Sequence, residues 1–394
     1  VFGCLLTVMT LLTFIAMVAA PAILYIYAPG FHDDPAKFDL AVDMFRLTIP
    51  YLMFMSLTAF ASSILNSYGS FSTPAFSPVL LNVAMIAGAW WLTPYMAEPI
   101  MALGWAVVVA GILQLAIQIP ELWRKKLLIP PKVDFKHEGV ERILKLMLPA
   151  LFGVSVTQIN LLLNTIWASF MQDGSVSWLY SAERMTELPL GLIGVAIGTV
   201  ILPSLSARHA EQDQTKFRGM LDWAARVIML VGIPASIALF MLSTPIIQAL
   251  FERGEFTWED TQMTALALQC MSAGVIAFML IKVFAPGFYA QQDTKTPVRV
   301  GLIAVATNAI LNIVFIGFFK LINWHAEHMA LALASSGSAL ANAGLLYYYL
   351  HKRNIFRFGS HWKKLFIQFV VANTIMATAL WFGLQWYNGE LSQW

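Results

Sequence analysis

Long apolar runs separated by short polar connectors dominate the chain. A helix needs about 20 apolar residues to cross a hydrocarbon core about 30 Å thick, and eleven runs are long enough. They lie near residues 2–28, 45–67, 77–96, 99–121, 144–171, 176–206, 221–251, 261–289, 298–320, 329–350 and 365–388. Helices are expected because lipid-exposed backbone must satisfy its own hydrogen bonds, and the alternating pattern of a transmembrane barrel is missing. The pattern predicts an all-α polytopic membrane protein with about eleven transmembrane helices.

Composition and charge favour a membrane protein and argue against nucleic-acid binding and metal binding. Hydrophobic residues make up 59% of the 394 residues and charged residues 12%, whereas a soluble domain has about 25% charged residues. The net charge of +2 is too small to indicate a nucleic-acid partner. Cys4 and Cys270 both lie in apolar runs, so we expect small buried residues rather than a disulfide or a metal pair. We therefore expect no metal site and no nucleic acid.

Basic residues concentrate in one set of alternating connectors. That set holds 17 Lys and Arg residues and the opposite set holds 4, so the positive-inside rule places the first set in the cytoplasm. The first run begins at Val1, with no charged residue before Asp33. Because a signal peptide would begin with a basic segment, we expect the chain to be a fragment cut inside, or just before, a membrane helix.

A hydrophilic connector over residues 122–138 divides the chain into a block of four runs and a block of seven. The segments "NSYGSFSTPAFSPVLLNV" from Asn66 and "YAQQDTKTPVRVGLIAVATN" from Tyr289 each place a polar turn and a Thr-Pro pair before a new helix. A duplicated transporter with parallel halves would produce this echo. The alternative is that proline commonly opens a helix without any duplication.

Three charges lie inside the sixth run, in the segment "SWLYSAERMTELPLGLIG" that begins at Ser177. With a rise of 1.5 Å per residue, Arg184 lies about 13 Å from the outer surface, close to mid-membrane. A central arginine costs about 2.5 to 3.5 kcal/mol on insertion scales, so it should face protein or water. Glu183 and Glu187 share part of its helix face. The functional interpretation is a water-filled cavity in which Arg184 meets an anionic head group. The structural alternative is a self-neutralising cluster that pins two helices together.

Other polar and helix-breaking residues support weaker hypotheses. Asn164 in one run, and Asn308 and Asn312 in another, are suited to coordinating a cation or to bonding across helices, and interhelical bonding is favoured. Prolines and glycines such as those of "ELPLGLIGVAIG" act as bending points in carriers or as close-packing surfaces. The chain has neither the paired membrane aspartates of an intramembrane protease nor an H-E-x-x-H zinc motif. No enzyme chemistry is expected.

Several segments together resemble one family. They are "APGF" (28–31), "ILNSYGSFSTPAFSPVLLN" (64–82), "GVSVTQINLLLNTIWASF" (153–170), "GSVSWLYSAERMTELPLGLIGVAIGTVILPSLS" (174–206) and "KVFAPGFYAQQDTKTPV" (282–298). The chain is similar over almost its whole length to the MurJ/MviN family, the lipid II flippases of bacterial cell-wall synthesis. These belong to the superfamily of multidrug, oligosaccharidyl-lipid and polysaccharide exporters.

The resemblance implies a two-lobed exporter fold with fourteen helices, of which two form an additional groove beside a central cavity. Residues 1–121 would be an N-terminal lobe lacking its first two helices, 122–138 a cytoplasmic linker, 139–350 the C-terminal lobe and 351–394 the first groove helix. The implied location is the bacterial inner membrane. Cationic residues that the family carries in its first two helices are not in this sequence.

The resemblance also implies a function and a site. The chain would flip lipid II to the outer leaflet by alternating access, with Arg184 on the pyrophosphate and Glu187, Ser177 and Glu183 beside it. No cofactor is implied; the membrane potential, and in some relatives a coupling ion, would drive the cycle. Relatives that bind sodium use carboxylates, whereas the matching region here offers the neutral Asn164, Asn308 and Asn312. The implied partners are lipid II, membrane lipids and other cell-wall synthesis proteins.

Two alternatives are distinguishable in principle. An ion-coupled exporter of drugs or polysaccharide lipids would need an acidic cavity for a cationic drug. A non-transporting membrane scaffold for cell-wall enzymes would tolerate replacement of Arg184 by alanine.

Overall fold

The computed structural model describes residues 1–128, 132–322, 325–359 and 361–391, and the regular structure in these ranges is helical. The chain forms two compact units, Val1–Phe152 and Gly153–Trp394. Their boundary falls inside α8 (Glu138–Ser169). The fold is therefore all-α, as the apolar runs predicted. The assignment of lobes, linker and groove helix to particular residue ranges remains a prediction.

Nine of the predicted runs coincide with apolar helical spans in the described part of the chain, some of them made of two or three consecutive helices. These are Pro35–Ser67, Ser72–Tyr95, Met101–Arg124, Ser175–Ala210, Gln214–Met241, Trp258–Tyr289, Lys295–Leu321, Met329–Lys352 and His361–Trp386. The run at 2–28 is a pair of helices bent by 75°. The run at 144–171 falls on α8, where the side chains of residues 144–157 lie outside the described residues. The predicted count of about eleven is thus close to the observed arrangement.

The bend in the first run lies at Ala19, between α1 (Phe2–Val18) and α2 (Ala20–Tyr27). Pro21 occupies the first turn of α2, where its missing N–H is tolerated but cannot continue the hydrogen bonds of α1. The apolar residues continue across this bend, so hydrophobicity alone does not reveal that the backbone hydrogen bonds are interrupted here.

The first unit packs around α6 (Met101–Ala116). Besides α1, α2 and the beginning of α8, its helices are η1 (Pro29–Asp33), α3 (Pro35–Thr48), α4 (Pro50–Ser67), α5 (Ser72–Ala87), η2 (Gly88–Leu92), η3 (Thr93–Tyr95) and α7 (Ile119–Arg124). A Cβ atom at Gly111 of α6 would lie 2.9 Å from the Cβ atom of Phe54 of α4. Without a side chain at that position, the two backbones approach closely, as in other membrane helix pairs.

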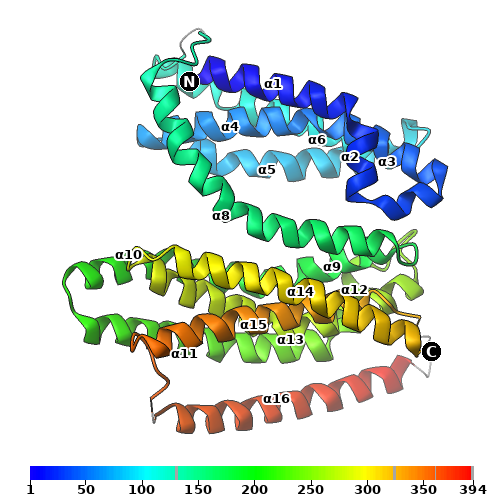
Figure 1. Cartoon of the computed structure of the whole chain (residues 1–394). Coiled ribbons are helices and arrows are strands. Elements are labelled where there is room, and N and C mark those ends of the chain that lie inside the picture. Colours follow the sequence, from blue (N-terminus) through cyan, green and yellow to red (C-terminus); the bar gives the residue numbers. More distant parts are fainter. Residues whose placement is uncertain (129–131, 323–324, 360, 392–394) are drawn as a thin grey trace. The chain divides into compact units, whose positions relative to one another are not determined.

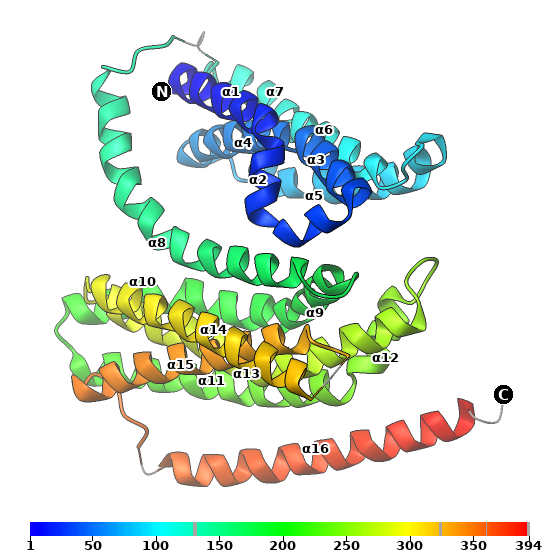
Figure 2. The same cartoon turned by 45° about the vertical axis from the view of Figure 1, so that its right-hand side comes forward.

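The second unit packs around α13 (Trp258–Tyr289). Its other helices are α9 (Ser175–Pro189), η4 (Leu190–Val195), α10 (Ala196–Ala210), α11 (Gln214–Met241), α12 (Ser243–Phe251), α14 (Lys295–Leu321), α15 (Met329–Lys352) and α16 (His361–Leu391). Figure 1 and the turned view in Figure 2 show α9, α11 and α15 around α13, and all three contact it. Leu268, Met279 and Phe284 of α13 are fully buried in this core.

α16 packs against α11 of the second unit (Figure 2). The buried Trp362 donates a hydrogen bond of 2.6 Å from Nε1 to Oδ1 of Asp222 in α11. Further along, Phe366, Ile367 and Ile375 are exposed. An apolar helix that packs against one neighbour and exposes large side chains along its length is suited to face lipid.

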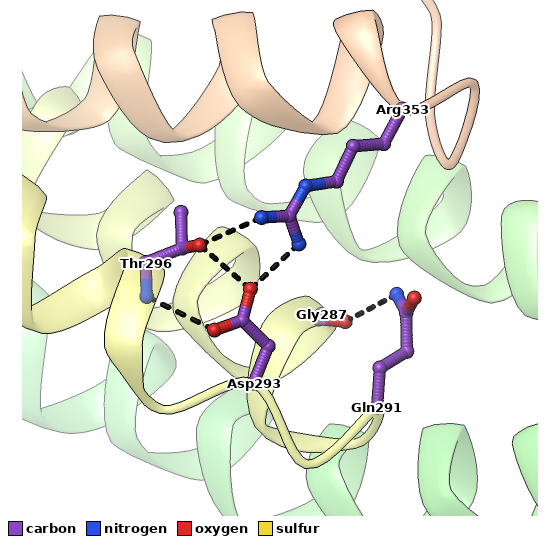
Figure 3. Close-up of polar contacts among 5 residues, drawn as sticks. All are labelled: Gly287, Gln291, Asp293, Thr296 and Arg353. Carbon is purple, nitrogen blue, oxygen red and sulfur yellow. Dashed lines mark hydrogen bonds and ion pairs between the residues drawn. The ribbon is translucent and has the colours of Figure 1, made fainter.

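A polar turn joins α13 to α14 at the end of the second unit that the positive-inside rule assigns to the cytoplasm. In Figure 3, Asp293 of this turn accepts hydrogen bonds from the backbone N–H and the hydroxyl of Thr296, at 3.0 and 2.6 Å. Arg353, at the end of α15, donates to Asp293 at 2.6 Å and to the Thr296 hydroxyl at 2.8 Å. The turn is therefore tied to the next helix of the unit.

The first unit ties its corresponding turn in the same way. Ser70, in the turn between α4 and α5, and Thr73, in the first turn of α5, both donate to the carboxylate of Glu121 in α7. Each turn contains a polar residue, then a threonine three positions later, then a proline. In each unit a charged side chain from a later helix end binds the turn: Glu121 in the first unit and Arg353 in the second. The short sequence echo thus has a structural counterpart in the two units taken separately.

The Asp293–Arg353 pair should make stability depend on pH in the acid range. Burial alone would raise the pKa of Asp293, but hydrogen bonds from Thr296 and Arg353 outweigh it and lower the pKa from 3.8 to about 2. The ionised form is stabilised on folding, so its contribution is complete above about pH 4 and is lost as pH falls toward 2. Because Arg353 is 44% exposed, solvent screening reduces this contribution to roughly 1 to 2 kcal/mol.

We expect Asp293→Asn to lower the thermal unfolding midpoint at neutral pH. The difference from the unmodified protein should shrink between pH 4 and pH 2.5, as followed by circular dichroism in detergent. Glu211→Gln removes an exposed pair with Arg208 and serves as the control, with an expected effect near zero. A midpoint difference for Asp293→Asn that stays constant with pH would contradict the assigned role of the carboxylate.

Candidate functional site

The outer end of α9 is fixed by a buried tryptophan. Trp178 is 3% exposed and donates a hydrogen bond of 2.7 Å from Nε1 to Asp260, near the beginning of α13. Its ring lies 5.1 Å from that of His328, whose Nε2–H donates to the backbone carbonyl of Met263 at 2.8 Å. Burial lowers the pKa of His328, which favours the neutral form of the ring. These contacts fix the rotation of α9 about its axis.

Gly174 begins this helix in a conformation that other residues avoid. Its φ is +94°, and a Cβ atom there would lie 2.5 Å from the Trp178 ring. Glycine therefore provides both the left-handed turn and the space for the tryptophan.

The rotation of α9 leaves one polar face uncovered by the second unit. Ser177, Tyr180, Arg184 and Glu187 are all exposed, and their spacing of three or four residues places them on one side of the helix. On the opposite side, Ala182 and Met185 are buried in the core that includes α13.

Arg184 is held by two neighbours on the same helix. Nη1 donates to Oε2 of Glu187 at 3.0 Å, and Nη2 donates to the hydroxyl of Tyr180 at 2.7 Å. The guanidinium also lies 4.8 Å from the centre of the Tyr180 ring. The Arg184 and Glu187 side chains are 55% and 51% exposed. Both partners lie one turn away on α9, so this ion pair does not connect α9 to another helix.

Glu183, the third charge predicted in this segment, does not lie on the exposed face with Arg184 and Glu187. Glu183 is half-buried, and its backbone carbonyl accepts a hydrogen bond of 2.8 Å from the Thr186 hydroxyl. A step of about 100° per residue turns Glu183 away from the direction of Arg184, whereas Glu187 follows Arg184 by almost one turn. The structure thus joins Arg184 with Glu187 and leaves Glu183 at the edge of the exposed face.

The helix changes its winding directly after this face. Pro189 has no N–H to continue the helical hydrogen bonds, and residues Leu190–Val195 form a π-helical segment, η4. Cβ atoms added to Gly194, within this segment, and to Gly198, in α10, would lie 3.8 and 3.7 Å from atoms of Lys282 in α13. These glycines form a packing surface, while the π-helical segment provides the irregularity that often accompanies functional sites.

The three predicted asparagines lie together, between α8, α14 and α15. The Nδ2 atom of Asn312 donates to Asn164 at 3.2 Å and to Asn308 at 3.0 Å. Asn164 donates in turn to the hydroxyl of Ser335 at 3.1 Å. The amides therefore bond across helices, as the favoured alternative predicted. Whether they also bind an ion remains a prediction.

Tyr180 is the site residue that the sequence interpretation missed. Its position four residues before Arg184 is the available signal, because side chains at that spacing are neighbours on a helix. Among the described residues, no group of three or more His, Cys, Asp and Glu side chains has the arrangement of a metal site.

Comparisons with known proteins agree with this architecture. The sequence model of the family described as "Lipid II flippase MurJ" matches residues 1–393. A probable lipid II flippase MurJ of Haemophilus influenzae is 42% identical, with 100% of this chain and 78% of the relative covered. The corresponding protein of Vibrio cholerae is 41% identical over 100% of this chain and 74% of its own length. A lipid II flippase MurJ of Burkholderia cenocepacia is 41% identical over 94% and 71%.

Solved structures show the same fold. A lipid II flippase MurJ in an inward closed conformation is similar with a TM-score of 0.81 and 26% identity, covering 97% of this chain and 77% of that one. An inward-facing multidrug transporter of the MATE family is similar with a TM-score of 0.71 and 14% identity, over 89% and 80%.

Proposed function

The chain belongs to the MurJ family of lipid II flippases, and from this membership we propose that it moves lipid II across the membrane by holding the pyrophosphate at Arg184. It is a multi-pass protein of the bacterial inner membrane. The observation that carries the proposed role of Arg184 is the exposed polar face of α9 around this side chain.

The depth of Arg184 requires a wet environment on that face. Arg184 is the tenth residue of α9, about 14 Å along a helix that rises 1.5 Å per residue. An arginine this deep costs about 2.5 to 3.5 kcal/mol when it faces lipid. Since the second unit leaves the guanidinium uncovered, we infer that it faces water within a transport cavity.

The contacts of Arg184 prepare it for an anion without neutralising it fully. An arginine stays charged at any working pH and presents a planar fork to phosphate oxygens. Tyr180 and Glu187 hold the guanidinium by one hydrogen bond each. Glu187 is half exposed, so solvent weakens its attraction for the arginine. We propose that the pyrophosphate takes over part of this pairing, with Ser177 as a further hydrogen-bond donor and Glu183 at the edge of the site.

In the proposed cycle lipid II crosses the membrane by alternating access and is not chemically changed. The head group enters a cavity open to the cytoplasm, its lipid tail stays in the membrane, and the cavity then opens outward. No bond of the substrate is broken, so the protein needs neither catalytic residues nor a cofactor. The membrane potential contributes about 2.3 kcal/mol per charge per 100 mV and would favour the return of an empty cationic cavity toward the cytoplasm. A coupling ion and other cell-wall synthesis proteins as partners remain part of the proposal.

Reconstitution tests the proposed function directly. Vesicles containing lipid II and the purified protein are treated with a membrane-impermeant reagent that modifies the head-group sugar. We expect lipid II of the inner leaflet to become accessible in these vesicles and to stay protected in protein-free ones. A dye-labelled phosphatidylcholine monitors leakage and should remain in its leaflet. Protection of lipid II equal to that in protein-free vesicles would contradict the proposal.

A further inference from the structure

A second cationic site lies at the cytoplasmic end of the second unit, away from α9. A cavity of about 530 Å³ opens between the first turns of α11 and the connector that leads from α15 to α16. Arg218 and Asp222 of α11 line it on one side, and Asn354, Arg357 and His361 line it on the other. The proposed transport function does not use this cavity.

Both carboxylate oxygens of Asp222, in the cavity wall, already have hydrogen-bond partners. Asp222 is buried and accepts hydrogen bonds from Trp362 on one oxygen and from Arg226 on the other. His361 Nε2 lies 3.3 Å from the same oxygen that Arg226 contacts. Because Arg226 compensates this charge, Asp222 does not neutralise the arginines at the opening of the cavity.

Two guanidinium groups converge there on one neutral residue. Arg218 donates to the backbone carbonyl of Asn354 at 2.5 Å, and Arg357 donates to the side-chain carbonyl of the same asparagine. Asp222 is the only acidic residue in the described lining of the cavity. Bringing two like charges together against neutral acceptors is unfavourable, and an anion bound between them would offset the repulsion.

The cavity lies at the level where lipid head groups are expected. Trp223, next to Asp222 on α11, is half exposed, as is typical of the membrane interface. On α16 the exposed Lys363 and Lys364 follow the cavity, and the exposed Phe366 and Ile367 begin the apolar face within the next turn. A molecule held in the cavity by an anionic group would therefore have apolar surface for hydrocarbon chains directly beside it.

We propose that this cavity binds the phosphodiester head group of an anionic phospholipid from the cytoplasmic leaflet. The forks of Arg218 and Arg357 match phosphate oxygens, and both donors are at least one-third exposed and reachable. Basic pockets between membrane helices on the cytoplasmic side commonly bind such head groups. The adjacent apolar face of α16 favours a lipid over free phosphate, which shares the same recognition chemistry. Bound lipid would connect α16 to α11, because both supply walls of the cavity.

Native mass spectrometry of the purified protein tests this proposal, with dioleoylphosphatidylglycerol as the probe. The double variant Arg218→Gln/Arg357→Gln should bind the lipid at least about tenfold more weakly, because two charge-assisted contacts are lost. The control Lys363→Gln/Lys364→Gln removes the same charge just outside the cavity and should change the affinity by less than about twofold, as exposed charges do. Arg218→Lys/Arg357→Lys keeps the charge without the planar fork and should give an intermediate affinity.

The outcomes separate the possible ligands. Dioleoylphosphatidylcholine should bind the unmodified protein more weakly than phosphatidylglycerol, and inorganic phosphate should not displace phosphatidylglycerol at equal concentration. Equal weakening in the two glutamine double variants would overturn the site, since it would report surface charge alone. Equal binding of the two lipids, or displacement by inorganic phosphate, would overturn the assignment to an anionic phospholipid. Circular dichroism of each variant establishes that its helices are intact, and the lysine variant decides the result if the glutamine variant is unfolded.

Discussion

Replacement of Arg184 by alanine is expected to abolish lipid II flipping while leaving the protein folded and abundant. The side chain is 55% exposed, and its hydrogen bonds within the described part of the chain go to Tyr180 and Glu187 of its own helix, so we expect its removal to cost little stability. In the proposed mechanism its removal takes a charged partner from the pyrophosphate, a loss of roughly 2 to 5 kcal/mol, which corresponds to a rate lower by about 30-fold to several thousandfold. The reconstituted vesicle assay measures the rate, and growth of cells that depend on this protein provides the second readout.

A control substitution at another arginine shows whether the loss of flipping is specific to Arg184 or follows from losing any positive charge. Arg208→Gln in α10 breaks a pair with Glu211 that has the same three-residue spacing and a length of 2.8 Å, and it should flip lipid II at the normal rate. Arg184→Lys should be impaired if the planar fork matters, because lysine offers a point charge. Normal flipping with Arg184→Ala would exclude the proposed site. Normal growth with this variant, together with no flipping by the unmodified protein, would favour the scaffold alternative.

The largest effect on stability is expected at the crossing of α13 and α15. A Cβ atom at Gly274 would lie 2.8, 2.9 and 3.1 Å from the hydroxyl oxygen, Cα and Cβ of Ser336. Ser336 cannot simply move away, because its hydroxyl donates to the carbonyl of Cys270 at 2.7 Å. Gly274→Ala should therefore force the two backbones apart and destabilise the protein by about 1 to 3 kcal/mol, and Gly274→Leu should prevent accumulation of folded protein.

Thermal unfolding in detergent and protein abundance in the membrane measure this effect. Gly344→Ala, on α15 with no atom within 4 Å of the added carbon, is the control and should be neutral or slightly stabilising, since alanine favours a helix. An unfolding midpoint for Gly274→Ala equal to that of the control would show that α13 and α15 can separate without cost.

The sequence predicted the helices well because hydropathy is a local property. Each apolar run marks a span regardless of what packs against it, and the basic connectors mark one side of the membrane. Three of those connectors meet in the second unit, where Arg218 bonds to Asn354 and Arg353 to Asp293. The bend at Ala19 was not predictable from the same signal, because the apolar run continues through it.

The arrangement of the candidate site was only partly predictable. The hydrophobic run and its three charges identified Arg184, but its exposure follows from the burial of Trp178 against α13. That contact joins Trp178 to Asp260, 82 positions apart, and no local pattern encodes it. For the same reason, the burial of Asp222 beneath Trp362, 140 positions away, could not be inferred from a carboxylate at the beginning of an apolar run.

The tied turns of the two units constrain how their parts can be exchanged. In the first unit hydroxyls of the turn meet a carboxylate, whereas in the second a carboxylate of the turn meets an arginine. A chimera that transplants the turn of the second unit into the first would place Asp293 against Glu121, two like charges at hydrogen-bond distance. Any recombination between the halves must therefore carry each turn together with the charged residue that binds it.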